Sequence, residues 1–214
     1  MGLEERRKRE RENRKNAITK AARKLFFEKG FKTVTVESIA KKAELSKGAI
    51  YLHYNSKEEI YAQILLSDIG KFHNTVSDVL QQSSDATDAL FHFADIYVEF
   101  FLNERELFRN LMNFMIRADC MNLPDDLYKE SIQTTNKTIT IIDRIFEYGI
   151  ARGEFPIDIN SRMNRNAVWG MLNGIIALYL FTSNEEKRAE IIRSTVKEGI
   201  EIFLRGLKIP RKTL

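Results

Sequence analysis

The stretch from Ser46 to Tyr54, SKGAIYLHY, combines residue types that suit contact with the edges of base pairs. If the stretch is helical, Ile50 and Tyr54 point back toward the protein core. The opposite side of that helix then carries Lys47, Gly48, Ala49, Tyr51, Leu52 and His53. Its two smallest residues add no bulk, the alanine methyl can touch a thymine methyl, and the tyrosine and histidine can reach phosphates or base edges. We therefore expect this helix to enter the major groove of DNA.

Two short helices joined by a turn would position these side chains. The segment TVESIAKKA reads as one helix capped by Thr35, and after a short connection Ser46 caps the next helix. Small residues at Ala40 and Ala43 let the two helices approach closely, which gives a helix-turn-helix arrangement. Both cap residues, with the backbone N–H groups at the two helix starts, suit phosphate oxygens. Lys57 and the basic helix before this motif supply further positive charge.

Positive charge is concentrated at the N-terminus. Residues 1–58 carry 16 Lys and Arg against 8 Asp and Glu, whereas the rest of the chain carries 18 against 22. A basic N-terminal segment followed by a mildly acidic remainder favours a polyanionic partner that binds only the N-terminal segment. A basic surface that is merely solvated would give the same charge distribution. The extension at 1–15 is either an arm that contacts DNA or a solvated helix, because its Glu and Arg recur at helical spacings.

The rest of the chain predicts an all-α fold. Apolar residues recur at three- and four-residue spacing, only three prolines interrupt the chain, and no alternating strand pattern or repeat is found. We expect a basic extension at 1–15, a DNA-binding domain at 16–62 and a helical domain at 63–214 for effector binding and dimerisation. The predicted helices cover 16–30, 35–43, 46–54, 56–82, 89–102, 104–117, 124–152, 161–181 and 185–207.

Residues 14–62 resemble the DNA-binding domain of the TetR family of transcriptional regulators. The residues that carry the resemblance are Gly30, Phe31, Thr35, Ile39, Ala40, Ala43, Ser46, Gly48, Ile50, Tyr51, His53, Tyr54, Lys57 and Glu58. The family commonly has glycine in the turn where this chain has Glu44. Either the turn is not left-handed at that point, or the chain tolerates a strain of roughly 1–2 kcal/mol.

The resemblance implies that the last two helices pair with a second copy of the chain as a four-helix bundle. Small residues and an apolar stripe on these helices are consistent with a dimer interface, although the same faces could pack in the chain's own core. The candidate interface residues are Gly170, Gly174, Ala177, Ile192, Val196, Ile200 and Phe203. A dimer is favoured because one recognition helix contacts too few base pairs for useful specificity.

The resemblance also implies a small-molecule effector bound by the second domain. Aromatic residues are the natural lining of such a pocket, although an aromatic stripe at helical spacing is more often plain core. The candidates are Phe93, Tyr97, Phe101, Phe108, Phe114 and Trp169. Their character predicts a largely apolar effector.

An enzyme is not expected. The sequence contains no glycine-rich phosphate loop, serine nucleophile elbow or HExxH zinc motif. His92 and Asp95 could form half of a metal site, but the two other histidines lie on different predicted helices. We therefore expect neither a cofactor nor a metal.

Cytoplasmic localisation and a regulatory role complete the expectation. Cys120 is the only cysteine and cannot form an internal disulfide, and the charged N-terminus is not a secretory signal. The longest apolar stretch, 167–181, is shorter than the roughly twenty residues of a membrane span. We predict a repressor that binds a roughly palindromic operator as a homodimer and is released by its effector; the alternative is a protein that coats DNA without sequence preference.

Overall fold

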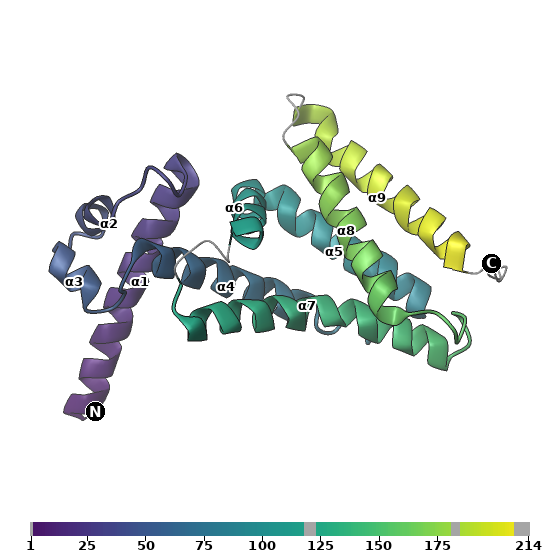
Figure 1. The fold of residues 1–214 in the computed structure, drawn as a ribbon, viewed down its shortest axis with the longest axis horizontal. Coiled ribbons are helices and arrows are strands. Elements are labelled where there is room, and N and C mark those ends of the chain that lie inside the picture. The colour runs from purple at the N-terminus through teal and green to yellow at the C-terminus, as the bar shows by residue number, and fades with distance from the viewer. Residues whose placement is uncertain (1, 118–122, 181–184, 208–214) are drawn as a thin grey trace. The chain divides into compact units, whose positions relative to one another are not determined.

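The computed structural model describes residues 2–117, 123–180 and 185–207, and all regular secondary structure within these ranges is helical (Figure 1). Cys120 lies outside the described residues. The helices are α1 (Leu3–Lys29), α2 (Val36–Lys42), α3 (Lys47–Tyr51), α4 (Lys57–Val76), α5 (Ala86–Asn103), α6 (Arg105–Arg117), α7 (Asp125–Ala151), α8 (Ser161–Leu180) and α9 (Glu185–Leu207). The prediction of an all-α fold is confirmed. None of the helices in the described ranges is both long and apolar enough to span a membrane.

The chain divides into two compact units. The N-terminal unit comprises Met1–Asp68 and Glu106–Ile132, and the C-terminal unit comprises Ile69–Arg105 and Gln133–Leu214. From the sequence we expected α6 in the second domain, 63–214, but in the structure it groups with the N-terminal unit. The Tyr61 hydroxyl on α4 donates to the Asn110 side-chain oxygen on α6 at 2.9 Å, and the Tyr61 and Phe114 rings lie 6.3 Å apart. These contacts join α6 to the start of α4.

The core of the N-terminal unit is built from one stripe of α1 and the inner faces of the helices that follow. Ile18 and Phe26 of α1, Ile39 of α2 and Ile60 of α4 are buried. α1 ends at Gly30, whose φ of 77° is left-handed and whose N–H donates to the Phe26 carbonyl at 2.9 Å. These contacts fix where the helix-turn-helix begins.

α1 begins at Leu3 rather than at residue 16, so the basic extension is a continuous part of this helix. Its residues 4–14 are exposed, so tertiary packing does not hold them. Once residues 18–26 are helical, each added residue gains a backbone hydrogen bond without a new nucleation cost. The i, i+4 pair between Glu10 and Arg14, at 2.7 Å, adds a side-chain contribution.

The C-terminal unit packs α5 against α8 and α9, and α8 and α9 lie side by side (Figure 1). Asp85 caps α5 by accepting from the Asp88 N–H at 2.8 Å, so this helix begins before the predicted residue 89. Gly149, near the end of α7, allows close packing: a Cβ there would lie 2.3 Å from a ring carbon of Phe155 and 2.8 Å from the Ala86 Cβ. This position therefore has no room for a side chain.

Candidate nucleic-acid interface

Local hydrogen bonds define the two helices of the helix-turn-helix. The Thr35 hydroxyl accepts from the Ser38 N–H at 3.2 Å, and the Ser46 hydroxyl accepts from the Ala49 N–H at 3.1 Å. Both predicted caps are therefore present. Ser56 caps α4 in the same way, accepting from the Glu59 N–H at 3.1 Å.

The turn between α2 and α3 adopts the left-handed conformation. Glu44 has a φ of 57°, and the Leu45 N–H donates back to the Ala40 carbonyl at 2.9 Å, as in a Schellman motif. The sequence left open whether the turn avoids the left-handed conformation at Glu44 or tolerates its strain, and the structure has the left-handed conformation. Glu44 is exposed, so no tertiary contact of its side chain offsets a strain of about 1–2 kcal/mol.

The recognition helix α3 is short and has a sharp division between its faces. Ile50 and Tyr54 are buried, which anchors the helix and the residues after it. Lys47, Gly48 and Tyr51 are exposed, and Ala49 is half-buried. A Cβ on Gly48 would meet only the Ser46 hydroxyl, at 3.9 Å, so the space in front of this glycine is open. The face expected to read DNA is therefore accessible.

Lys47 is held by a partner from α2. Its ammonium forms an ion pair with the Glu37 carboxylate, and it lies 5.9 Å from the centre of the Tyr51 ring. The hydrogen bond to Lys47 lowers the pKa of Glu37, and the same bond raises the pKa of Lys47. Lys47 is therefore charged and oriented before any DNA arrives, but a phosphate must share it with Glu37 or displace it.

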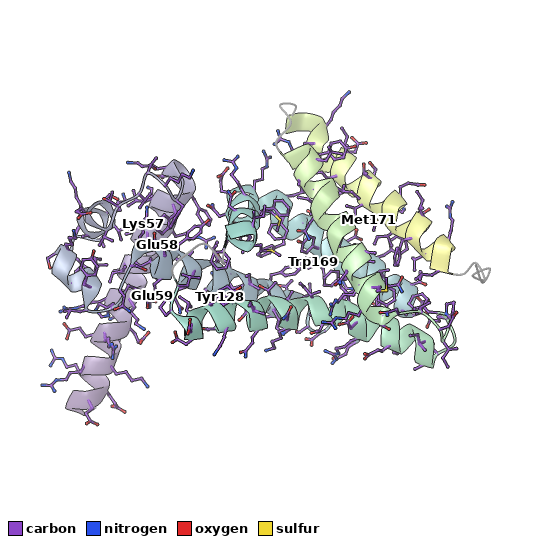
Figure 2. The ribbon with its side chains drawn as sticks, in the orientation of Figure 1. Lys57, Glu58, Glu59, Tyr128, Trp169 and Met171 are labelled. Atoms are coloured by element: carbon purple, nitrogen blue, oxygen red, sulfur yellow. The ribbon has the colours of Figure 1, made fainter. Side chains whose placement is uncertain are left out.

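Lys57 does not act as the free surface charge that the sequence suggested. Its ammonium donates to the carbonyls of Phe31 at 3.1 Å and Val34 at 3.0 Å, and it lies 4.5 Å from the centre of the Phe31 ring. Figure 2 shows Lys57 with Glu58 and Glu59 at the start of α4. Lys57 thus ties α4 to the segment between α1 and α2, and its contribution in the free protein is structural.

His53 turns toward the protein rather than outward. It is half-buried, and its Nδ1 is buried with no hydrogen-bond partner in the described part of the chain. Burial of the ring lowers the pKa of His53, and the positive charges of Arg11, Lys15 and Arg14 lower it further. Both effects favour the neutral imidazole of His53 in the free protein.

The structure adds two features beside the recognition helix. Leu52, just after α3, is 73% exposed, which is unusual for a leucine in a folded domain. It lines a hollow of about 360 Å³ together with His53 and four residues of the N-terminal part of α1, Arg7, Glu10, Arg11 and Arg14. The spacing of these four residues, which places them on one helix face, was the available sequence signal.

The candidate effector residues separate into two groups. Phe93, Tyr97, Phe101 and Trp169 belong to the C-terminal unit, whereas Phe108 and Phe114 belong to the N-terminal unit. In the first group the Tyr97 ring lies 4.9 Å from Phe101 and 5.0 Å from Trp169, between ring centres. Phe93, Tyr97 and Phe101 have almost no accessible surface and pack in sequence along α5, and only Trp169 of these four, labelled on α8 in Figure 2, is half-buried.

One polar contact lies inside this aromatic group. The Tyr97 hydroxyl donates to the Asn173 side-chain oxygen at 2.7 Å, and the Asn173 amide donates to the Trp169 carbonyl at 2.7 Å. Burial raises the pKa of Tyr97, so the phenol stays protonated. This contact explains why Asn173 interrupts the otherwise apolar part of α8 from residue 167 on.

The candidate dimer residues also divide. Ile192, Val196 and Ile200 are buried within the protomer, which is a correction to their assignment, because a side chain without exposed surface cannot add contact area with a partner. Gly170 and Gly174 are exposed, and a Cβ on either would meet no atom within 4 Å. Ala177 and Phe203 are half-buried. The glycine face of α8 is therefore available, whereas the predicted stripe of α9 is not.

The exposed apolar residues of α8 and α9 define a different surface, which we call the α8–α9 face. On α8, Met163 is 69% exposed and Leu178 is 64% exposed; on α9, Ile191 is 38% exposed and Ile202 is 58% exposed. Gly199 on the adjoining side of α9 contacts α8, because a Cβ there would lie 2.9 Å from the Met171 sulfur. Figure 2 labels Met171 on α8. The exposed residues thus lie beside the line along which the two helices meet.

Comparison with known proteins gives two family matches that together span most of the chain. Residues 18–64 match the model described as "Bacterial regulatory proteins, tetR family", and residues 71–209 match "QacR-like protein, C-terminal region". The transcriptional regulator QacR of Staphylococcus aureus is 28% identical over 199 residues, covering 91% of this chain and 98% of QacR. The regulator SrpR of Pseudomonas putida is 23% identical over 197 residues, covering 86% of this chain and 82% of SrpR.

Solved structures share the whole fold. PfmR, a TetR-family regulator from Thermus thermophilus, has a TM-score of 0.67 at 25% identity and covers 90% of this chain and 99% of its own. FadR from Bacillus subtilis, solved in complex with stearoyl-CoA, has a TM-score of 0.71 at 19% identity and covers 89% of this chain and 97% of its own. At that identity the second likeness concerns the fold and not the ligand.

Proposed function

Because the chain belongs to the TetR family of bacterial transcriptional regulators, we propose that it is a ligand-responsive repressor that binds a roughly palindromic operator as a homodimer. The matched relatives are named transcriptional regulators, so the chain is a regulator and not an enzyme. Repression, operator symmetry, cytoplasmic location and effector release belong to the proposal.

The observation that carries the proposal is the open face of α3. Lys47, Gly48 and Tyr51 are exposed, whereas Ile50 between them is only 1% exposed. A helix anchored by one face and presenting small and hydrogen-bonding residues on the other suits the major groove. In this proposal Lys47 and Tyr51 contact base edges or phosphates, and the Ala49 methyl meets a thymine methyl.

A dimer would place two such helices on successive turns of DNA, and the α8–α9 face is the proposed interface. Its exposed Met163, Leu178 and Ile202 form the type of apolar surface that marks interaction sites. Gly170 and Gly174 would let the α8 helices of the two protomers approach closely. This face replaces the buried stripe first predicted on α9.

Effector release requires a ligand that binds one dimer geometry more tightly than the other. The aromatic group of the C-terminal unit supports a largely apolar effector, and the half-buried Trp169 is its most accessible member. The Tyr97–Asn173 contact supplies the only polar pair that we assign to effector binding. An effector with one hydrogen-bonding group would fit this composition.

The test begins with recovery of the DNA that the full-length protein prefers. Genomic fragments bound at about 0.15 M salt are selected, and the enriched duplex is titrated against a scrambled duplex of the same composition. A regulator prefers its operator by at least roughly a thousandfold. Equal affinity for the two duplexes would instead support a protein that coats DNA nonspecifically.

Replacement of Lys47 or Tyr51 by alanine tests the recognition helix. Operator affinity is expected to fall by roughly tenfold or more for each, the loss of about 1–3 kcal/mol typical of a base contact. Helicity and dimerisation stay unchanged because both side chains are exposed. Lys129→Ala, an exposed lysine on α7, is the matched control. Unchanged operator affinity in both variants would remove α3 as the reading helix.

Gly174→Leu tests the α8–α9 face. The new side chain meets no atom of the protomer near its Cβ, so the fold is retained, but a partner helix would be pushed away. Sedimentation is expected to show monomers at concentrations where the wild type is a dimer. Gly70→Leu on α4, where a Cβ also meets no atom within 4 Å, controls for the added leucine. A normal dimer for Gly174→Leu would contradict this interface.

A further inference from the structure

The N-terminal part of α1 runs past the recognition helix (Figure 1). A hollow between α1 and the residues just after α3 is the feature that the proposed function leaves unused. α1 contributes Arg7, Glu10, Arg11 and Arg14 to its wall. The opposite wall is Leu52 and His53, immediately after α3. All of these residues belong to the N-terminal unit.

The arginines of this hollow form one stripe. Positions 7, 11 and 14 recur at intervals of four and three, which places them on a single helix face, and all three are exposed. Arg14 is paired with Glu10 at 2.7 Å, whereas Arg7 and Arg11 form no ion pair with the residues that the structure describes. The stripe therefore carries positive charge that the protein does not neutralise.

The positive charge of the arginine stripe affects the neighbouring His53. The positive charges of Arg11 and Arg14 contribute to the low pKa of His53, after the larger effect of burial. The third wall residue, Leu52, offers apolar surface with 73% of its area exposed. The hollow thus has unneutralised positive charge on the α1 wall and apolar surface on the opposite wall, beside the helix proposed to read DNA.

The dimensions suit a DNA strand. Arg14 lies seven positions after Arg7 in the helix, which corresponds to a rise of roughly 10 Å. A single strand of duplex DNA carries one phosphate per roughly 3.4 Å along the axis, or about three over that length. Arginines and apolar stems commonly contact phosphates and sugars, and such contacts position a protein without reading sequence.

We propose that this hollow binds the sugar–phosphate backbone of the operator beside the base pairs read by α3. Arg7 and Arg11 contact consecutive phosphates, and Leu52 packs against a sugar. The proposal rests on the proposed function, because it assumes that α3 lies in the major groove. In this proposal the basic extension makes specific contacts with the DNA backbone and does not act only through long-range electrostatic attraction.

The test compares two double variants of equal net charge. Arg7→Gln with Arg11→Gln removes the free arginines of the hollow, and Arg6→Gln with Arg9→Gln removes two exposed arginines of the same helix that do not line the hollow. Glutamine is a good helix former, so α1 is retained, which circular dichroism checks. Arg14 is left in place because it pairs with Glu10.

Operator binding is measured against salt concentration. Each lost phosphate contact lowers the slope of log affinity against log salt by about one, so the R7Q/R11Q dimer is expected to lose about four, while R6Q/R9Q changes little. The ratio of affinities for operator and scrambled duplex stays within about twofold of wild type, because phosphate contacts carry no sequence information. Hydroxyl-radical footprinting should show loss of backbone protection beside each half-site only in R7Q/R11Q.

Two outcomes overturn the inference: equal slope changes in both double variants, which indicates diffuse electrostatics, or no slope change in R7Q/R11Q. Either result leaves the proposed function standing if the wild type still prefers its operator. Failure of the wild type to discriminate between the two duplexes is a separate result and refutes the proposed function instead.

Discussion

One backbone position in each of the two units shows a different reason why glycine matters, and the two reasons are opposite. Glu44 in the N-terminal unit has a left-handed φ of 57° but an open, exposed environment. Gly149 in the C-terminal unit is helical but faces a Phe155 ring carbon 2.3 Å from where its Cβ would lie. At Glu44 the left-handed backbone favours glycine, although there is room for a side chain. At Gly149 the helical backbone would accept any residue, but the neighbouring side chains leave no room for a Cβ. At Glu44 the backbone conformation is therefore the constraint, whereas at Gly149 it is the space around the residue.

The largest expected effect is at Gly149. Gly149→Ala should lower the free energy of unfolding by about 1–3 kcal/mol, because the new methyl group overpacks the contact with Phe155 and Ala86. Urea denaturation at a fixed protomer concentration measures the change. Gly70→Ala on α4, where a Cβ meets nothing, is the matched control and should be neutral or stabilising by about 0.5–1 kcal/mol. Equal stability of the two variants would contradict the packing argument.

A smaller effect of opposite sign is expected at Glu44. Glu44→Gly relieves about 1–2 kcal/mol of left-handed strain and loses part of that gain to the greater freedom of unfolded glycine, so a net stabilisation of about 1 kcal/mol is expected. Thermal and urea denaturation measure it. Glu44→Ala keeps the strained backbone and should show no gain. Destabilisation by glycine would mean that the Glu44 side chain, and not its backbone, matters.

The smallest expected effect is a dependence of stability on pH, to which each unit contributes one histidine. Burial lowers the pKa of His53, with Arg11, Lys15 and Arg14 adding to the shift. Burial likewise lowers the pKa of His73, with Lys137 and Arg144 adding to it. Because the unfolded chain binds these protons at higher pH than the folded one, stability is fully present above the ordinary value of 6.5 and declines as the pH falls below it.

Urea midpoints at pH 7.5 and 5.5 test this sign. His53→Gln and His73→Gln should each reduce the loss of stability on acidification, and the double variant should reduce it further. An unchanged loss in the double variant would show that other groups cause it.

Short-range chemistry made much of the interface predictable. The caps at Thr35, Ser46 and Ser56 depend on hydrogen bonds to residues three positions ahead, which the sequence displays directly. The buried faces of α1 and α3 follow from the same helical spacing. The left-handed turn at Glu44 was one of two alternatives, because a non-glycine residue allows it only at a cost.

What sequence could not predict depends on contacts between distant residues. Lys57 donates to carbonyls 23 and 26 positions earlier, and nothing in its local sequence indicates this. The stripe of Ile192, Val196 and Ile200 was expected to be buried against a second copy, but it is buried within the protomer, and an apolar stripe alone does not indicate which of the two partners covers it. The same ambiguity affected Phe93 and Tyr97, since packed core and pocket lining share one composition.

The ion pair between Glu37 and Lys47 affects how binding data should be interpreted. Added salt screens the contact between Lys47 and a phosphate, but it also weakens the hold of the competing carboxylate. The two effects oppose each other, so the salt dependence of operator binding counts fewer phosphate contacts than the protein makes. In Glu37→Gln the competing carboxylate is neutral, so the contact between Lys47 and the phosphate would contribute fully to the salt dependence. The slope of log affinity against log salt would then be steeper than in the wild type.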